Sequence, residues 1–97
     1  IEHLFSDIEI EYFLKYKHPE EHIAGYFCAK ESILKALGTG ITPSVGWKDI
    51  IITHNKLGKP LVCTTSKIFD KFNIKYIEIS ISHSKQNAIA NALVLFA

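Results

Sequence analysis

The segment from Ile23 to Leu37, IAGYFCAKESILKAL, most constrains the fold of this chain. Large apolar side chains recur along it at the helical period and small residues fill the remaining faces, so no broad polar side is left. Such a helix must be buried on nearly all sides. Lys30, Glu31 and Lys35 lie in its middle and need partners, because an unpaired buried charge costs several kcal/mol.

Two helices are predicted in the first half of the chain. Ser6 and Glu9 have the spacing of a capping box, which predicts a helix from about Asp7 to Lys17. His18-Pro19 ends this helix, and Pro19 suits the first turn of the next one. The long helix then runs from about residue 20 and ends at Gly38, a natural C′ residue.

The second half of the chain predicts strands with one inserted helix. The segment 47–53 is rich in β-formers, and a turn leads from it into the short strand 61–65. A brief helix is expected at 66–72. The segment 74–84 alternates apolar and polar residues, and an apolar strand at 88–97 follows a turn. The order predicts a small α+β domain spanning residues 1–97.

Composition excludes several classes of protein. The net charge of +1 gives no global basic field for nucleic-acid binding, and no apolar run approaches the roughly 18 residues of a membrane span. We therefore expect a soluble protein with no nucleic-acid or membrane partner. Cys28 and Cys63 match no disulfide framework and predict reduced thiols in an intracellular compartment. The chain begins at Ile1 and contains no Met, which predicts a domain truncated at its N-terminus.

Three residues of the long helix form a stripe that could carry chemistry. Glu31, Lys35 and Gly38 are spaced by four and three residues, so they lie on the same side of the helix. A carboxylate, an ammonium and the exposed backbone of a glycine would then border the same part of the surface. One interpretation is a solvated Glu-Lys pair worth about 0.2–0.5 kcal/mol. The other is half of a Mg²⁺ and phosphate site. The following GTGITPS lacks the Gly-Lys-Ser/Thr ending of a P-loop and follows a helix, which excludes a Walker motif.

The stripe belongs to a longer motif. The residues that carry it are Phe27, Lys30, Glu31, Lys35, Ala36 and Gly38, followed by Gly58-Lys59-Pro60 and ISISHS from Ile79 to Ser84. In this order they resemble the signature of the 4′-phosphopantetheinyl transferases, in particular the small, single-domain holo-(acyl-carrier-protein) synthase type. The similarity covers most of the chain.

The resemblance implies an enzyme of fatty acid biosynthesis that uses coenzyme A, with Mg²⁺ as cofactor. It would transfer the 4′-phosphopantetheine group to a serine of apo acyl carrier protein and release adenosine 3′,5′-bisphosphate. By position, Glu31 is a catalytic residue and metal ligand, and Lys35 is a catalytic residue that contacts the phosphate under attack. The implied coenzyme-binding residues are Lys30, Gly38, Thr39, Lys59, Pro60, Ser82, His83 and Ser84.

The resemblance also implies an assembly and a location. The long helix would pack on an antiparallel sheet, and the chain would form a homotrimer with active sites at subunit interfaces. The expected compartment is the cytoplasm, or the plastid stroma in a plastid-bearing eukaryote.

The chain departs from the family pattern in two respects. The family's Gly-x-Asp strand, whose Asp is the second protein ligand of Mg²⁺, and the basic helix after it are absent from residues 1–97, and Asp7 does not replace that Asp. In addition, Tyr26 stands where the family often has an Arg.

Three alternatives remain open. The chain could be a non-catalytic module, derived from this fold, that binds coenzyme A or an acyl carrier protein. It could also be an α+β interaction domain without a small-molecule site. Finally, His83 on its own could be a hydrogen-bonded filler at a strand end rather than a ligand contact.

Overall fold

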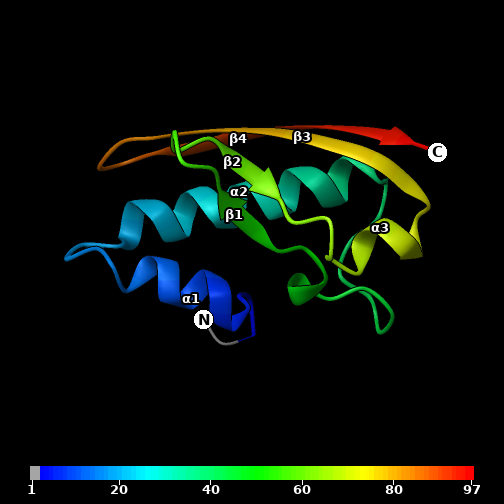
Figure 1. The fold of residues 1–97 in the computed structure, drawn as a ribbon, viewed down its shortest axis with the longest axis horizontal. Coiled ribbons are helices and arrows are strands. Elements are labelled where there is room, and N and C mark those ends of the chain that lie inside the picture. The colour runs from blue at the N-terminus through cyan, green and yellow to red at the C-terminus, as the bar shows by residue number, and fades with distance from the viewer. Residues whose placement is uncertain (1–2) are drawn as a thin grey trace.

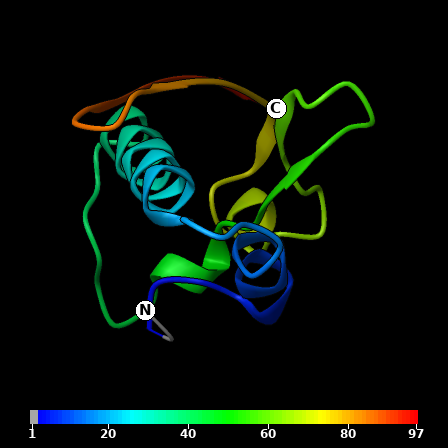
Figure 2. The ribbon, with the colours of Figure 1, turned by 90° about the vertical axis from the view of Figure 1, so that its left-hand side faces the viewer.

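The computed structural model describes residues 3–97 and has two layers around a long helix (Figure 1). A hairpin of two long strands covers one side of that helix, and a short hairpin and a short helix lie beside it, the short hairpin next to the long one (Figure 2). Within these residues no helix has both the length and the apolar character needed to span a membrane. The elements are α1 (Asp7–Phe13), α2 (Glu20–Ala36), the 3₁₀ helix η1 (Trp47–Asp49), β1 (Ile52–His54), β2 (Pro60–Val62), α3 (Ile68–Lys71), β3 (Ile74–His83) and β4 (Ala88–Phe96).

The strands form two separate antiparallel pairs. In the long pair, β3 and β4 run in register from Ile77 opposite Val94 to His83 opposite Ala88, and the register shifts near Ile74. In the short pair, Ile52 lies opposite Val62. The predicted α+β class, with a long helix packed on an antiparallel sheet, is confirmed.

Small side chains let α2 lie against the hairpin. The Ser32 hydroxyl donates to the carbonyl of Ala90 at 2.9 Å, so α2 supplies a partner to the backbone of β4. At Gly25 a Cβ would stand 2.8 Å from Cγ2 of Ile81, which explains why this helical position has no side chain. The close packing fixes the end of β3 beside the start of α2.

Two predicted elements were wrong at their boundaries. The first helix ends at Phe13 rather than Lys17, because the amides of Lys15 and Tyr16 bond to carbonyls three residues back and tighten the chain into turns. The segment 47–53 is not a strand from its start. There the Asp49 carboxylate accepts from the amide of Gly46 at 3.0 Å and closes a 3₁₀ turn before β1 begins.

A buried ion pair joins these elements at the core. Nζ of Lys30 lies 2.8 Å from Oε1 of Glu9, and neither side chain is exposed to solvent. The ammonium also donates to the carbonyls of Leu4 (2.8 Å) and Trp47 (3.1 Å). Oε2 of Glu9 accepts from the amide of Ile52 at 3.0 Å. Burial lowers the pKa of Lys30 and the Glu9 carboxylate opposes that change, so each charge depends on the other.

We predict that breaking this pair from one side unfolds the domain at much lower denaturant concentration. Glu9→Gln or Lys30→Met should each cost about 3–5 kcal/mol of unfolding free energy, because the remaining charge is buried without its counter-ion. Urea unfolding followed by circular dichroism measures this. Lys35→Met, an exposed position on the same helix, should stay within about 0.5 kcal/mol of the wild type. Equal losses in all three variants would contradict the role of the pair.

Candidate functional site

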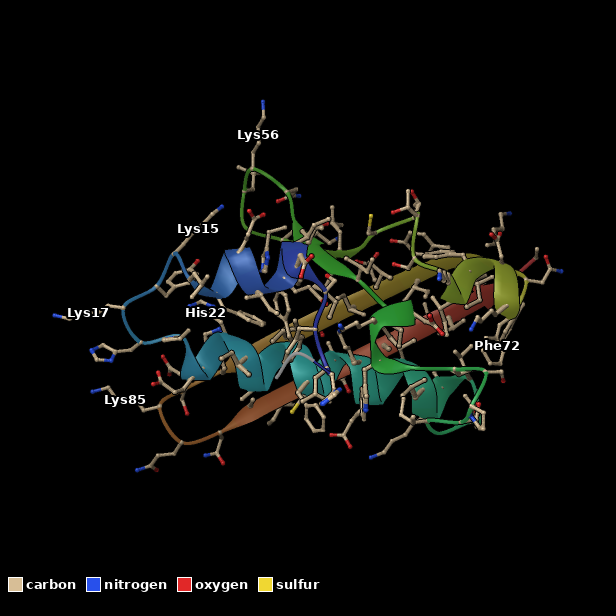
Figure 3. All side chains as sticks on the ribbon, turned by 90° about the horizontal axis from the view of Figure 1, so that it is seen from below. Lys15, Lys17, His22, Lys56, Phe72 and Lys85 are labelled. Atoms are coloured by element: carbon tan, nitrogen blue, oxygen red, sulfur yellow. The ribbon has the colours of Figure 1, made fainter. Side chains whose placement is uncertain are left out.

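A cavity of about 960 Å³ opens between α1, the first half of α2, the β1–β2 hairpin and the end of β3. Figure 3 shows four lysines that project from loops at this end of the molecule: Lys15, Lys17, Lys56 and Lys85. Two of these, Lys15 and Lys56, line the cavity itself. The opening therefore favours anionic ligands.

Parallel aromatic rings form one wall of the cavity. Tyr12 stacks on His54 with ring centroids 4.5 Å apart and on Tyr26 at 5.3 Å. The Tyr26 hydroxyl lies 2.8 Å from Nδ1 of His54, so α2 and β1 are joined through a hydrogen bond. This wall is rigid and presents flat apolar surfaces beside polar ring edges.

A second group of rings continues the wall toward β3. Tyr16 stacks on His22 at 3.8 Å, and His22 lies 5.1 Å from His83. The His83 ring lies beside Gly25, where a Cβ would stand 3.6 Å from its Cδ2, an ordinary contact distance. The cavity therefore gathers three imidazoles, from the start of α2, the end of β1 and the end of β3.

Burial and neighbouring charges shift the pKa values of His22, His54 and Tyr26. Burial and the neighbouring His83 lower the pKa of His22, against a smaller opposing effect of Glu21. Burial and His22 lower the pKa of His54. Burial raises the pKa of Tyr26 above the range reached in water, so its hydroxyl stays protonated.

The predicted stripe of Glu31, Lys35 and Gly38 lies at the other end of α2. Glu31 is half-buried and Lys35 is exposed. The ion pairs of residues 3–97 are Glu9–Lys30, Lys59–Glu78 and Asp49–Lys71, so Glu31 and Lys35 do not form the solvated pair considered from their spacing. Both charged groups are available to a ligand.

A glycine turn ends the helix beside this stripe. The amide of Thr39 bonds to the carbonyl of Leu34, and that of Gly38 to the carbonyl of Lys35, which is a Schellman motif. Gly38 has φ +75°, a conformation that favours glycine. The Thr39 hydroxyl donates to the carbonyl of Gly40 at 3.2 Å.

The remaining predicted coenzyme contacts fall into two sets. Pro60 and His83 line the large cavity together. Lys59 is exposed and pairs with Glu78, and Ser82 is exposed near the strand end. Ser84, in the turn after β3, accepts a hydrogen bond from the amide of Gln86.

Lys30 does not fit the predicted role of a coenzyme contact. Its ammonium is fully buried and all three of its N–H groups are taken by Leu4, Glu9 and Trp47. It therefore holds the core together, and we do not carry it into the site.

Several cavity residues were not singled out by the sequence. They are Tyr12 of α1, Tyr16 of the turn after it, His22 of α2 and His54 of β1. The sequence itself shows only that the two tyrosines are four residues apart, as are His22 and Tyr26. That spacing also fits an ordinary helix stripe. The approach of His54 and His83 depends on tertiary packing.

A metal could be held only in part by these residues. No cluster of three or more His, Cys, Asp or Glu able to bind a metal occurs in the described part of the chain. Glu31 is a half-buried acidic residue that none of the ion pairs of residues 3–97 engages. Mg²⁺ commonly takes one or two carboxylates and completes its shell with phosphates and water, so the donor set fits such an ion.

Comparisons with known proteins show the family and the fold. A model of the 4′-phosphopantetheinyl transferase superfamily matches residues 1–93. A holo-(acyl-carrier-protein) synthase of Thermoanaerobacter sp. (strain X514) is 48% identical over an alignment 98 residues long that covers 98% of this chain and 70% of that protein.

Two solved structures are similar in fold. The Helicobacter pylori holo-(acyl-carrier-protein) synthase in complex with coenzyme A has a TM-score of 0.82 and 36% identity, over 96% of this chain and 78% of that one. The Bacillus anthracis enzyme in complex with CoA (3′,5′-ADP) has a TM-score of 0.83 and 32% identity, over 99% of this chain and 79% of that one.

We predict that the lowered pKa values of His22 and His54 make the domain less stable in mild acid. In the unfolded chain each imidazole titrates near 6.5, above its pKa in the fold, so the unfolded state binds more protons as pH falls. The unfolding free energy should decline between pH 7.5 and 5.5. Denaturant unfolding across this range measures the slope. It should flatten in a His22→Gln/His54→Gln variant, and an unchanged slope would contradict the assignment.

Proposed function

Because the chain belongs to the 4′-phosphopantetheinyl transferase superfamily, and within it to the holo-(acyl-carrier-protein) synthases, we propose that it transfers 4′-phosphopantetheine from coenzyme A to a serine of apo acyl carrier protein. The serine oxygen forms a bond to the phosphorus that carries pantetheine. The pyrophosphate P–O bond breaks, adenosine 3′,5′-bisphosphate leaves with that electron pair, and the serine proton passes to a base.

This proposal rests mainly on one observation: near the end of α2, Glu31 and Lys35 lie one turn apart, and neither engages in an ion pair within residues 3–97. Phosphoryl transfer depends mainly on positioning and neutralisation of charge. The Lys35 ammonium meets the phosphate under attack. Glu31 takes the serine proton directly or through a bound water.

Mg²⁺ is part of the proposal as a cofactor held by Glu31. When bound, it would neutralise the charge that develops on the pyrophosphate. The second protein ligand is the Asp of the family's Gly-x-Asp strand, a motif that residues 1–97 do not contain. The backbone of Gly38 and Thr39 lies beside this place and offers its polar groups to the coenzyme.

The adenosine end of coenzyme A is assigned to the large cavity. Pro60 and His83 line it, and we propose as further contacts their neighbours in sequence, Lys59, Ser82 and Ser84. The lining combines flat aromatic surfaces with Lys15, Lys56 and three imidazoles, groups that suit the base and the phosphate of a phosphorylated nucleoside.

We also propose that the chain works as a homotrimer. Glu31 and Lys35 do not line the cavity that holds His83, so neighbouring copies can complete one another's sites. The outer face of the β3–β4 hairpin carries Ile89, Leu93 and Leu95, which are 64%, 63% and 51% exposed. Contact between copies through this face buries apolar area that a small domain otherwise leaves in water.

The location is proposed from the same family. The cytoplasm, or a plastid stroma, supplies coenzyme A and apo carrier protein together. Both cysteines of the chain are free thiols, in keeping with a reducing compartment.

Mass spectrometry of apo acyl carrier protein incubated with coenzyme A, Mg²⁺ and the full-length protein tests the activity. We expect a gain of one phosphopantetheine. Glu31→Ala and Lys35→Ala should each lower the rate at least about 100-fold, the usual cost of losing a charge-stabilising group or a general base. Lys48→Ala, an exposed lysine on η1, is the matched control. Coenzyme A binding without transfer would favour the binding module, and wild-type rates in both variants would refute the roles.

Sedimentation velocity tests the assembly. The wild type should sediment as a trimer, and Leu93→Lys should shift it toward monomer, because a charge then enters the apolar face. Leu57, 95% exposed at the tip of the β1–β2 turn, provides the control variant Leu57→Lys, which should remain trimeric. A monomeric wild type at micromolar concentration contradicts the proposal.

A further inference from the structure

The unusual property of the large cavity is the gathering of three histidines in one aromatic wall. His22 lies 5.1 Å from His83 between ring centroids, and His54 shares the cavity with both. Burial lowers the pKa of His22 and of His54, and the neighbouring imidazoles add to this, His83 acting on His22 and His22 acting on His54. In the free protein at neutral pH His22 and His54 are therefore mainly uncharged.

Few acids face these histidines. Glu11 of α1 and Lys15 of the turn after it line the cavity, together with two tyrosines. Glu21 of α2 acts on His22, and Lys56 of the turn after β1 lines the opening. On β3, the titratable group that lines the cavity is His83 itself. Two carboxylates thus oppose two ammonium groups, and the sign of the cavity is decided by the three imidazoles.

We propose that His22, His54 and His83 form a proton-coupled phosphate site: a phosphate monoester dianion enters the cavity together with at least one proton taken up by the imidazoles. The site therefore binds phosphorylated ligands more tightly as pH falls from 8 toward 6. The identity of the natural ligand, coenzyme A, rests on the proposed function, whereas the coupling rests on the cavity alone.

The physical reason is that a bound dianion offsets the burial and the repulsion that disfavour a charge on His22 and His54. A protonated imidazole donates from both ring nitrogens, and such charge-assisted hydrogen bonds to phosphate are about twice as strong as neutral ones. The stacked rings of Tyr12 and Tyr16 hold His54 and His22 in place, so little ordering is needed on binding. Below about pH 6 the phosphate itself takes a proton, which ends the gain.

Calorimetry of the full-length protein tests this with two phosphate monoesters as probes, adenosine 3′-monophosphate and adenosine 3′,5′-bisphosphate. Titrations at pH 7 in two buffers of different ionisation enthalpy count the protons exchanged on binding. We expect net uptake of about one proton, and up to tenfold tighter binding for each pH unit between 8 and 6.

The variants separate this coupling from simple binding. His22→Gln should lower both the proton uptake and the pH dependence, and His22→Gln/His54→Gln/His83→Gln should abolish them. His3→Gln, exposed and outside the cavity, should leave both unchanged. Circular dichroism at pH 7.5 verifies that each variant is folded.

Three results would overturn the proposal: binding without proton uptake, uptake that persists in the triple variant, and no binding of either probe between pH 6 and 8. None of these readouts involves transfer to a carrier protein. Failure of the coupling is therefore distinct from failure of the transferase, which the mass assay reports.

Discussion

The buried ion pair between Glu9 and Lys30 is the contact on which the arrangement of the whole domain depends. It joins the N-terminal cap of α1 to the middle of α2, and its outer hydrogen bonds reach the carbonyl of Trp47 and the amide of Ile52. Replacement of such pairs by apolar groups is often tolerated, whereas loss of one partner is not. The main effect of the pair is therefore to specify which segments pack together, and its net contribution to the free energy of unfolding is small.

This constraint places the site. Lys30 directs its side chain into the core, and Glu31, the next residue, points to another face of the same helix, where its carboxylate stays half-buried. The rigid α2 then separates the Glu31 stripe from Gly25 and the cavity by about 9 Å, six residues at 1.5 Å each. An elongated ligand with phosphates along its length, or a second copy of the chain, is needed to use both places.

Local patterns predicted the parts of the fold that depend on neighbours in sequence. The capping box of Ser6 and Glu9 and the Schellman turn at Gly38 form as expected. The partner of Lys30 lies 21 residues away, and its burial followed from no local spacing. Lys30 was assigned to the coenzyme because the motif places it beside Glu31, yet adjacent helical residues face different surroundings.

The cavity shows the same limit and adds a chemical consequence. Its wall depends on contacts such as Tyr26 with His54, 28 residues apart. Family members often carry an arginine at the position of Tyr26, and a guanidinium keeps its charge at every physiological pH. Here a neutral phenol bonds to an imidazole, whose charge changes near neutrality. The charge at this place therefore depends on pH and on the tertiary packing that brings the imidazoles together.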